Sequence, residues 1–267
     1  MIELSQEIKA GGRIVSRIKK TVYSLAKPEF GRSLTFALVS DLHSQAPDEV
    51  IEMLKDDKPD CILLPGDIFE RLGGLCENIN ENGFELLEKV SQLAPSFYSI
   101  GNHENGGVNS WYPGWKKKTI PSQCRKVDVE RIEATGVCFL DDRYVIKDGI
   151  AIGGLTSGLI NEGNRPHLEW LDGFCALDVP KVLLCHHPEY YTEYLKDKDI
   201  SLIVSGHAHG GQWRIFGRGV FAPGQGLFPK YTSGVHDGRL VVSRGLCKGG
   251  IIPRIFNPRE IVYIKIN

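Results

Sequence analysis

The sequence predicts a single α/β domain of the sandwich type, and three observations support this. The chain has 267 residues, of which 42% are hydrophobic, so it can bury a sizeable core. From residue 34 onward, short apolar runs alternate with stretches of helical periodicity. The apolar runs are bounded by Gly, Pro or Ser, as strands commonly are. This alternation is typical of sheets covered by helices.

Five apolar runs are predicted to be buried strands, because they are short and rich in aliphatic side chains. They cover residues 33–40, 60–66, 96–101, 179–185 and 200–206. Helices are predicted where apolar residues recur at three- and four-residue spacing, at 46–59, 82–95 and 127–136, the first with Pro47 in its first turn. Three further short strands are expected to form an antiparallel meander that leads into a second sheet, at 136–140, 143–149 and 150–155.

Residues 1–33 are expected to form a basic helical extension, followed by one domain over residues 34–267. The apolar residues of this extension recur at helical spacing: Ile14, Ile18, Val22 and Leu25. The same stretch carries five bases before its next acid: Arg13, Arg17, Lys19, Lys20 and Lys27. A helix of this kind can lie on an anionic membrane surface through residues 13–27, or it can pack its apolar stripe on the domain.

The composition excludes several classes of protein. The 32 Lys and Arg residues against 33 Asp and Glu give a net charge of -1, so nucleic acid is not an expected partner, and no obligate protein partner is evident. Seven scattered cysteines form no C-x-x-C pair, which favours a reducing compartment. There is no apolar run of membrane-spanning length and no secretory signal. We therefore expect a cytoplasmic protein. If the basic extension binds lipid rather than the domain, the contact would be peripheral, at the inner membrane face.

Polar side chains follow five of the predicted strands at the point where each strand ends. They are Asp41 and His43, then Asp67, then Asn102, His103 and Glu104, then His186 and His187, then His207 and His209. Side chains beyond the carboxyl ends of strands in an open α/β sheet converge on one crevice. One such residue alone is ordinarily a turn former, but five strand ends in chain order predict a site. Nitrogen and oxygen donors in this number suit two ions of manganese, iron or zinc that share a carboxylate.

The segment 205–213 places two of these histidines among glycines. In an extended strand, side chains two residues apart point the same way, so we expect His207 and His209 to present one donor to each ion. The flanking glycines are expected to let the backbone pass close to the metals: Gly206, Gly210 and Gly211.

In chain order, the strand-end residues form a series of short motifs. The series is D-x-H at Asp41 and His43, G-D at Gly66 and Asp67, G-N-H-E at 101–104, a lone His186, and G-H-x-H at 206–209. It resembles the calcineurin-like metallophosphoesterase superfamily from about residue 34 onward. The tail of the chain is similar to a bacterial branch of membrane- and cell-wall-associated phosphodiesterases. The resemblance implies a four-layer α/β/β/α sandwich with two mixed β-sheets and a dinuclear metal site at the strand ends.

The resemblance also implies how the two ions are held. Asp67 would bridge them, and a hydroxide that bridges the ions would attack phosphorus. The first ion would take Asp41, His43 and His209, and the second would take Asn102, His186 and His207. Manganese is the expected metal, with iron and zinc as alternatives.

Three further residues would act beside the ligands. His103 would face the leaving-group oxygen as a proton donor. The protein-phosphatase branch carries G-D-x-x-D-R where this chain has "GDIFER", so Glu70 would orient His103 in place of an aspartate. Arg71 would grip a phosphate oxygen or form a surface salt bridge. His187 is expected next to the ligands rather than among them.

The expected reaction is hydrolysis of a phosphodiester, either lipid-linked, from the cell envelope, or soluble. The preference for a diester rests on the few cationic residues near the motifs, apart from Arg71 and the lysines at 116–118. An insertion at 104–126 carries Trp111, Tyr112 and Trp115 and is a candidate substrate rim or a solvated flap. A phosphomonoesterase or a nuclease of the same superfamily is the first alternative. A non-catalytic metal-binding scaffold is the second, although such a chain would ordinarily have lost a ligand.

Overall fold

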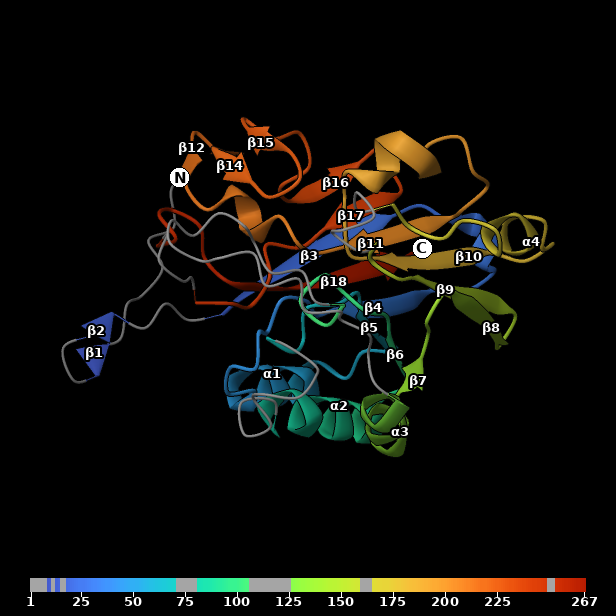
Figure 1. Ribbon diagram of the computed structural model, residues 1–267, viewed down its shortest axis with the longest axis horizontal. Coiled ribbons are helices and arrows are strands. Elements are labelled where there is room, and N and C mark those ends of the chain that lie inside the picture. Colours follow the sequence, from blue (N-terminus) through green and yellow to red (C-terminus); the bar gives the residue numbers. More distant parts are fainter. Residues whose placement is uncertain are drawn as a thin grey trace.

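The protein is built from two six-stranded sheets that lie face to face (Figure 1). This computed structural model describes residues 18–70, 81–105, 126–158, 165–248 and 253–267, and the backbone of β1 (Lys9–Ala10) and β2 (Arg13–Ile14). One buried apolar cluster lies between the sheets, and one lies on the outer face of each sheet. The predicted four-layer α/β/β/α sandwich with two mixed sheets is therefore confirmed.

The first sheet is completed by segments that are far apart in the sequence. In spatial order its strands are β3 (Lys19–Leu25), β18 (Glu260–Ile266), β4 (Leu34–Leu38), β5 (Cys61–Leu64), β6 (Ser96–Tyr98) and β7 (Cys138–Phe139). β4 to β7 are parallel, whereas β18 is antiparallel to β4. The outer face packs on α1 (Asp48–Asp57), α2 (Glu81–Leu93) and α3 (Lys126–Ala134).

The second sheet is also mixed. In spatial order its strands are β16 (Gly234–His236), β17 (Leu240–Val242), β11 (Leu202–Ser205), β10 (Lys181–Cys185), β9 (Ile150–Leu155) and β8 (Arg143–Lys147). Its outer face packs on α4 (Leu171–Cys175) and on a short π-helical turn, η4 (Tyr191–Leu195). Every residue of β5, β9, β10 and β11 is buried, which explains why these strands are continuous apolar runs in the sequence.

Two small hairpins lie between β11 and β16. They are β12 (Arg214–Ile215) with β13 (Arg218–Gly219), and β14 (Phe221–Ala222) with β15 (Gly226–Leu227). Two 3₁₀ turns complete the described elements, η1 (Pro28–Phe30) and η5 (His209–Gly211). Within the described ranges, no helix combines the length and the apolar character that a membrane span needs.

The helix predicted near the N-terminus is wrong where the structure describes that segment. β2 lies at Arg13–Ile14, and Lys19–Leu25 is a strand that pairs with β18 along its whole length. The boundary at residue 33 is wrong for the same reason, because β3 is an edge strand of the first sheet. Thr21, Tyr23 and Leu25 are the less exposed residues, at period two. Lysines are common on edge strands, and from the sequence alone the lysines of β3 are interpreted as the charged face of a helix.

The predicted antiparallel meander is only partly correct. β8 and β9 are antiparallel neighbours in the second sheet. β7 instead pairs parallel with β6 and ends the first sheet. The connection from β7 to β8 therefore carries the chain from the first sheet to the second, and the connection from β17 to β18 brings it back.

Candidate metal centre

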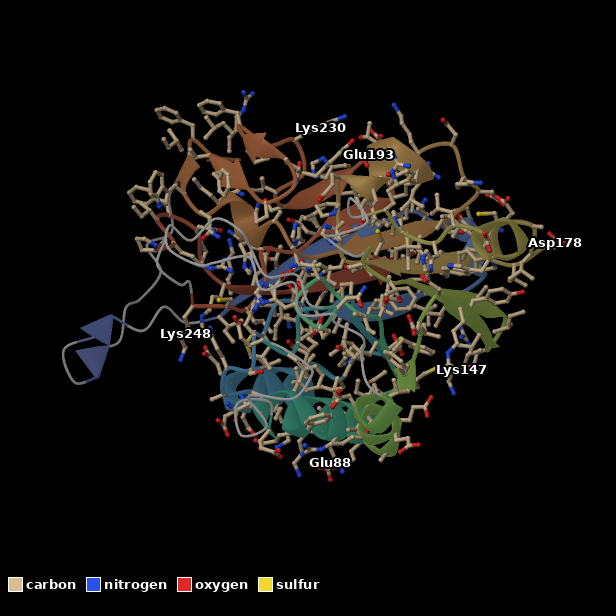
Figure 2. All side chains as sticks on the ribbon, viewed as in Figure 1. Glu88, Lys147, Asp178, Glu193, Lys230 and Lys248 are labelled. Carbon is tan, nitrogen blue, oxygen red and sulfur yellow. The ribbon has the colours of Figure 1, made fainter. Side chains whose placement is uncertain are left out.

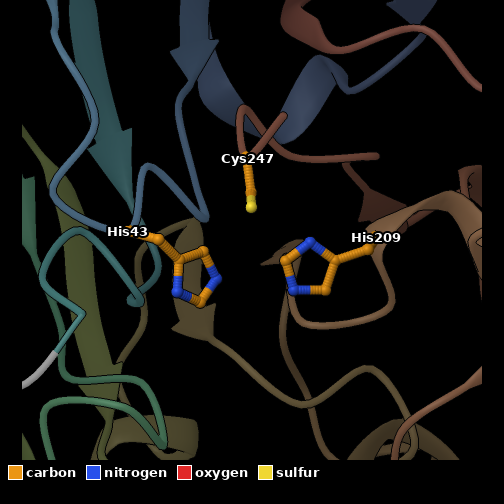
Figure 3. Close-up of side chains that lie close together, drawn as sticks. All are labelled: His43, His209 and Cys247. Carbon is orange, nitrogen blue, oxygen red and sulfur yellow. The ribbon is translucent and has the colours of Figure 1, made fainter. Parts of the chain in front are cut away.

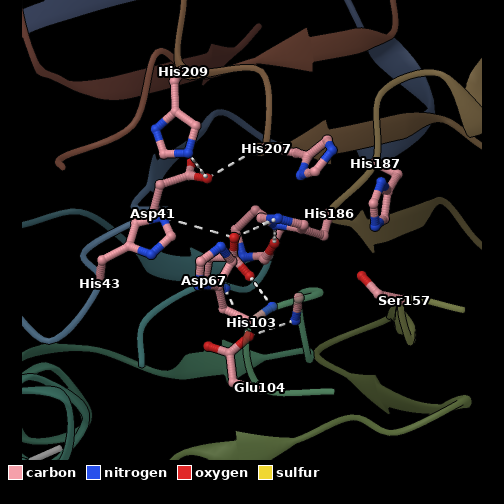
Figure 4. Close-up of polar contacts among 12 residues, drawn as sticks. Asp41, His43, Asp67, His103, Glu104, Ser157, His186, His187, His207 and His209 are labelled. Atoms are coloured by element: carbon pink, nitrogen blue, oxygen red, sulfur yellow. Dashed lines mark hydrogen bonds and ion pairs between the residues drawn. The ribbon is translucent and has the colours of Figure 1, made fainter. Parts of the chain in front are cut away.

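The loops after β4, β5, β6, β10 and β11 bring the predicted ligands together (Figure 4). Asp67 lies in the middle of them. Its Oδ2 atom is 3.1 Å from His186 Nε2 and 3.7 Å from His43 Nε2. These imidazoles come from the two different predicted ion sites, so the carboxylate of Asp67 is in position to bridge them.

Two groups of candidate ligands share Asp67. Asp41 and His43 form one group with it, and His186 and His207 form the other. Within each group, the ligand atoms lie within 4.8 Å of one another. This division is the one that the resemblance implies, although the role of each ligand stays a prediction.

The donor atoms at the centre fit metal ions. Among the described residues, four of them are buried without a hydrogen-bond partner: Asp41 Oδ2, His43 Nε2, Asn102 Oδ1 and His186 Nε2. A buried polar atom without a partner is costly, so several at one place fit bound metal ions. Nitrogen and oxygen donors from imidazole, carboxylate and amide groups suit a divalent ion of the first transition row or zinc.

The backbone around the ligands is held in an unusual conformation. Five predicted ligands have a positive φ, between 46° and 63°: Asp41, His43, Asp67, His207 and His209. Residues other than glycine rarely adopt this region, and such residues concentrate at functional sites. Hydrogen bonds between the loops hold them there. His43 N donates to Asp67 O at 3.0 Å, and His207 N donates to Asp41 Oδ1 at 2.9 Å.

The segment from Gly206 to Gly211 is a tight turn, and the predicted extended strand is wrong. Ala208 is helical, with φ -74° and ψ -11°, and η5 begins at His209. The turn nevertheless serves both groups. The ring centroid of His209 lies 5.2 Å from that of His43, and the ring centroid of His207 lies 5.0 Å from that of His186.

The glycines of this turn leave no room for a side chain, for two different reasons. A Cβ atom at Gly206 would lie 2.5 Å from Asp41 Oδ2, so a side chain there would collide with a predicted ligand. A Cβ at Gly210 would instead collide with Asn257 Oδ1, and one at Gly211 would collide with the Cα of Gly219. The expected passage close to the metals therefore holds for Gly206, while the other two glycines pack against neighbouring chain segments.

The charges at the centre are strongly coupled. Burial opposes ionisation of Asp67, but His186 and His103 hold the pKa of Asp67 well below its usual value. Asp67 in turn overcomes the effect of burial on His186 and raises the pKa of His186 to about 10. Burial and nearby imidazoles lower the pKa of His207 and His209 well below 6.5. A lowered pKa favours the neutral form of these two rings, which is the form that binds a metal.

His103 and Glu70 lie together at the edge of the ligand cluster. His103 N donates to Asp67 Oδ1 at 2.9 Å, and its Nδ1 lies 3.1 Å from Glu70 O and 3.6 Å from Glu70 Oε1. Burial opposes the charged form of His103, but Asp67 and Glu70 raise its pKa to about 9. Glu70 Oε2 also lies 3.0 Å from Nδ1 of the ligand His43, and despite partial burial the two imidazoles lower the pKa of Glu70 to about 2.

Glu104 is a residue whose role the sequence did not reveal. Its side chain is completely buried and accepts three backbone hydrogen bonds, from Asp67 N at 2.9 Å, Phe69 N at 3.0 Å and Gly101 N at 2.8 Å. Burial and the nearby Asp67 carboxylate raise the pKa of Glu104. The carboxylate fastens the loop after β5 to the loop after β6, and both loops carry predicted ligands. Its place in the G-N-H-E motif was the available signal.

Two residues near the C-terminus also lie at the centre, and neither has a local signal in the sequence. The Cys247 side chain lies beside His43 and His209, and the three could share an ion (Figure 3). Arg254 Nη2 lies 3.4 Å from His209 Nδ1. Its Nε and Nη1 atoms are buried without a hydrogen-bond partner in the part of the chain that the structure describes, and burial lowers its pKa. A buried guanidinium with open donors is suited to an anionic ligand.

The remaining predicted residues are placed as follows. His187 lies beside the centre, with Nδ1 3.0 Å from Glu189 Oε1 and its ring centroid 4.1 Å from that of His207. Arg71 and the aromatic and lysine residues predicted for the substrate rim lie outside the described residues.

Known proteins share this organisation. Residues 34–211 match the family model of the calcineurin-like phosphoesterases. The chain is 24% identical over 200 residues to the phosphodiesterase YaeI of Escherichia coli, covering 72% of this chain and 61% of that protein. An uncharacterized metallophosphoesterase of Aquifex aeolicus is 25% identical over 265 residues, covering 94% and 91%.

Longer relatives contain the same region. A Bos taurus transmembrane protein with a metallophosphoesterase domain is 26% identical over 212 residues, and the match covers 74% of this chain but only 45% of that protein. Among solved structures, one described as a novel archaeal phosphodiesterase covers 80% of this chain and 86% of its own, at 14% identity and a TM-score of 0.41. The family model spans the β4, β5, β6, β10 and β11 strand ends and the seven ligands predicted from the sequence. The protein therefore belongs to the calcineurin-like phosphoesterase family.

Proposed function

We propose that this phosphoesterase hydrolyses a phosphodiester at the centre around Asp67. The observation that carries the proposal is the sharing of Asp67 by two ligand groups, with four buried donor atoms left open. Two divalent ions bound there would supply Lewis acidity toward a phosphoryl oxygen and lower the pKa of water. A complete ligand set with His103 in place argues against the non-catalytic scaffold.

His103 has the position and the charge of a proton donor. Its Nδ1–H donates toward Glu70 O, so Nε2 is the ring atom that can deliver a proton to a leaving-group oxygen. Asp67 and Glu70 stabilise its cationic form. Glu70 thereby acts as a positioning residue for His103, and its second oxygen orients His43 in the same way.

Arg254 supplies a cationic contact for the phosphate. Its guanidinium faces His209 and has two open donor atoms, so it can bind a phosphoryl oxygen beside the ions. A diester carries one negative charge and a monoester carries up to two near neutral pH. One buried guanidinium matches the single charge of a diester, and a relative named as a phosphodiesterase, YaeI, points the same way.

A substrate screen tests this proposal. The metal-reconstituted protein should cleave a bis-nitrophenyl phosphodiester faster than the nitrophenyl monoester, and the screen should include lipid-linked diesters and single-stranded nucleic acid. Faster turnover of the monoester would replace our proposal with a phosphomonoesterase, and a preference for nucleic acid would replace it with a nuclease.

The first prediction concerns the proton donor. His103→Ala should keep its metal content but lose roughly 10²- to 10⁴-fold in kcat on a diester with an alkyl leaving group. The loss should be smaller with a nitrophenyl leaving group, which departs without a proton. His167→Ala removes a histidine whose side chain is 77% exposed, and it serves as the control. Equal losses on both substrates, or an empty metal site, would contradict the proposed role.

The second prediction concerns Arg254. Arg254→Gln should lower kcat/KM by roughly ten- to a hundredfold, since a hydrogen bond to a charged group contributes about 1.5–3 kcal/mol. The kcat/KM of Arg254→Lys should lie between those of wild type and Arg254→Gln, because lysine keeps the charge but lacks the planar guanidinium with its several donors. Metal content should stay at the wild-type level. A loss of metal from Arg254→Gln would show that Arg254 acts by positioning His209.

The resident metal is proposed from the donors. Manganese suits the oxygen- and nitrogen-rich set, while a thiol at Cys247 would favour zinc or iron in the group that contains His43 and His209. Elemental analysis of the purified protein and of Cys247→Ser would decide between them.

The cytoplasmic location and a membrane contact through residues 13–27 stay predictions. The membrane contact can no longer be argued from a helix, and deletion of residues 1–17, described below, tests it.

A further inference from the structure

We propose that a lobe beside the metal centre docks the protein onto an anionic membrane surface. This hairpin lobe consists of residues 212–230 and 253–256 and includes strands β12 to β15. β12, β14 and β15 lie at the edge of the molecule opposite α1, α2 and α3 (Figure 1). The lobe is a different surface from the N-terminal segment, and it follows directly on η5.

The lobe exposes an unusual number of large apolar side chains. Ten large hydrophobic residues are exposed among those described, and seven of them belong to the lobe: Trp213, Ile215, Phe216, Leu227, Phe228, Ile255 and Phe256. Phe216 is fully exposed, and Phe228 and Phe256 are 79% and 86% exposed. Single exposed apolar residues are ordinary, whereas a cluster marks an interaction surface.

The three phenylalanines are held in a backbone conformation that bulky residues avoid. Phe216, Phe228 and Phe256 have φ values of 48°, 52° and 52°. Phe216 and Gly217 form the two-residue turn between β12 and β13, with positive φ at both positions. Such a turn favours Asn-Gly, and Asn tolerates the left-handed region far better than Phe does. The chain keeps phenylalanine at these three positions despite this conformational cost, which indicates a function for the rings.

Hydrogen bonds join the two hairpins and the 253–256 segment into one body. Arg214 N donates to Ile255 O at 3.0 Å, and Val220 N donates to Trp213 O at 2.9 Å. Phe228 N donates to Val220 O at 2.8 Å. The parts of the lobe that carry the exposed apolar residues are therefore linked through the backbone.

The charge of this region selects an anionic surface. The lobe itself has four Lys and Arg residues and no acid, in a chain that is close to neutral as a whole: Arg214, Arg218, Lys230 and Arg254. Arg218 and Lys230 are exposed. Figure 2 shows Lys230 at the edge of the molecule that carries β14 and β15. Exposed aromatic side chains beside exposed bases match a lipid interface with anionic headgroups.

The lobe is directly connected to the predicted ligands. Gln212 follows η5, which begins at His209, and Asn257 Nδ2 donates to His209 O at 2.6 Å. Arg254 belongs to the lobe and lies against the His209 ring. Docking would thus bring the centre close to the level of lipid headgroups. If the proposed function holds, the substrate is a phosphodiester presented at the membrane surface.

The test uses the purified holoenzyme and sedimentation with vesicles. Phe216→Asn, Phe228→Asn and Phe256→Asn are combined, since Asn fits all three backbone positions and the fold should be kept. Wild type should sediment with vesicles of phosphatidylcholine and phosphatidylglycerol, and the triple variant should bind roughly tenfold or more weakly. Ile146→Asn, which changes an exposed apolar residue on β8, is the control and should bind like wild type. Activity on a soluble diester should be unchanged in both variants.

A second pair of variants tests the charge. Arg218→Gln and Lys230→Gln should each weaken binding to the anionic vesicles by about fivefold and leave binding to pure phosphatidylcholine unchanged. A deletion of residues 1–17, which keeps β3, tests the N-terminal contact in the same assay. Unimpaired binding by this deletion variant supports docking through the lobe.

Four outcomes would overturn the docking proposal. Wild type fails to sediment with anionic vesicles, or the triple variant binds as wild type does. In the third, the deletion alone abolishes binding. In the fourth, light scattering shows that the wild type is a dimer and the triple variant is a monomer, so that a second copy covers the lobe.

The two proposals fail separately. Vesicle binding without diester hydrolysis would overturn only the proposed function, and hydrolysis without vesicle binding would overturn only the docking.

Discussion

Asp67→Asn is expected to lower kcat by about a thousandfold or more, because the lost metal chemistry contributes several kcal/mol to transition-state stabilisation. The amide is neutral and offers a single oxygen, so it cannot bridge two cations as the carboxylate can. Asp67 Oδ2 also lies near both His186 and His43, and without the charge these rings lose the group that orients them. Metal content, measured by elemental analysis after dialysis, should fall for both ions.

The control for this variant is Asp178→Asn. Asp178 is exposed at the periphery, far from the centre in the view of Figure 2. That change should leave both activity and metal content at wild-type levels. An Asp67→Asn protein that keeps two ions per chain and most of its activity would show that the bridge lies elsewhere.

Glu104→Ala is expected to destabilise the protein by about 3–5 kcal/mol, because it leaves three buried N–H groups without an acceptor. This is a large part of the net stability of an ordinary domain, about 5–15 kcal/mol. For a chain of this length, the melting temperature should fall by roughly 10 °C. Thermal unfolding of the metal-free protein is the measurement, so that lost metal binding does not contribute.

Two further variants calibrate this result. Glu104→Gln keeps a carbonyl oxygen that can accept from the two N–H groups bonded to Oε2, but it lacks an acceptor for the third. This variant should therefore lose about half as much stability as Glu104→Ala. Glu85→Ala removes an exposed acid from α2 and should leave the melting temperature nearly unchanged. If Glu104→Ala melted within a degree or two of wild type, Glu104 could not be what fastens the two loops.

The strands and the ligand set could be predicted because their signals are local. β5 and β11 are continuous apolar runs, and a polar motif follows each of them at once. Asp67, His207 and the other predicted ligands therefore came from the sequence without knowledge of the packing. The geometry of the turn at Ala208 could not be predicted, because the glycines that flank the His-Ala-His segment permit several backbone paths.

The features that could not be predicted depend on distant parts of the chain. β3 is a strand because it pairs with β18, and its own residues carry a helical apolar spacing that competes with period two. Arg254 reaches His209 only because Trp213 pairs with Ile255. The burial of Glu104 likewise depends on backbone groups 35 and 37 residues away. Pairings of this kind leave no pattern within a sequence window.

The position of β18 between β3 and β4 also has a consequence for synthesis on the ribosome. Thr21 and Glu260 are hydrogen-bonded partners separated by 239 residues, and at about 5–20 residues per second that interval takes roughly 10–50 s to translate. Until β18 emerges, β4 has an open edge where its neighbour will be. The loop that β4 leads into carries Asp41, against which Gly245, in the segment between β17 and β18, packs. The nascent chain therefore cannot assemble its metal centre early, and it depends on protection of that edge while translation continues.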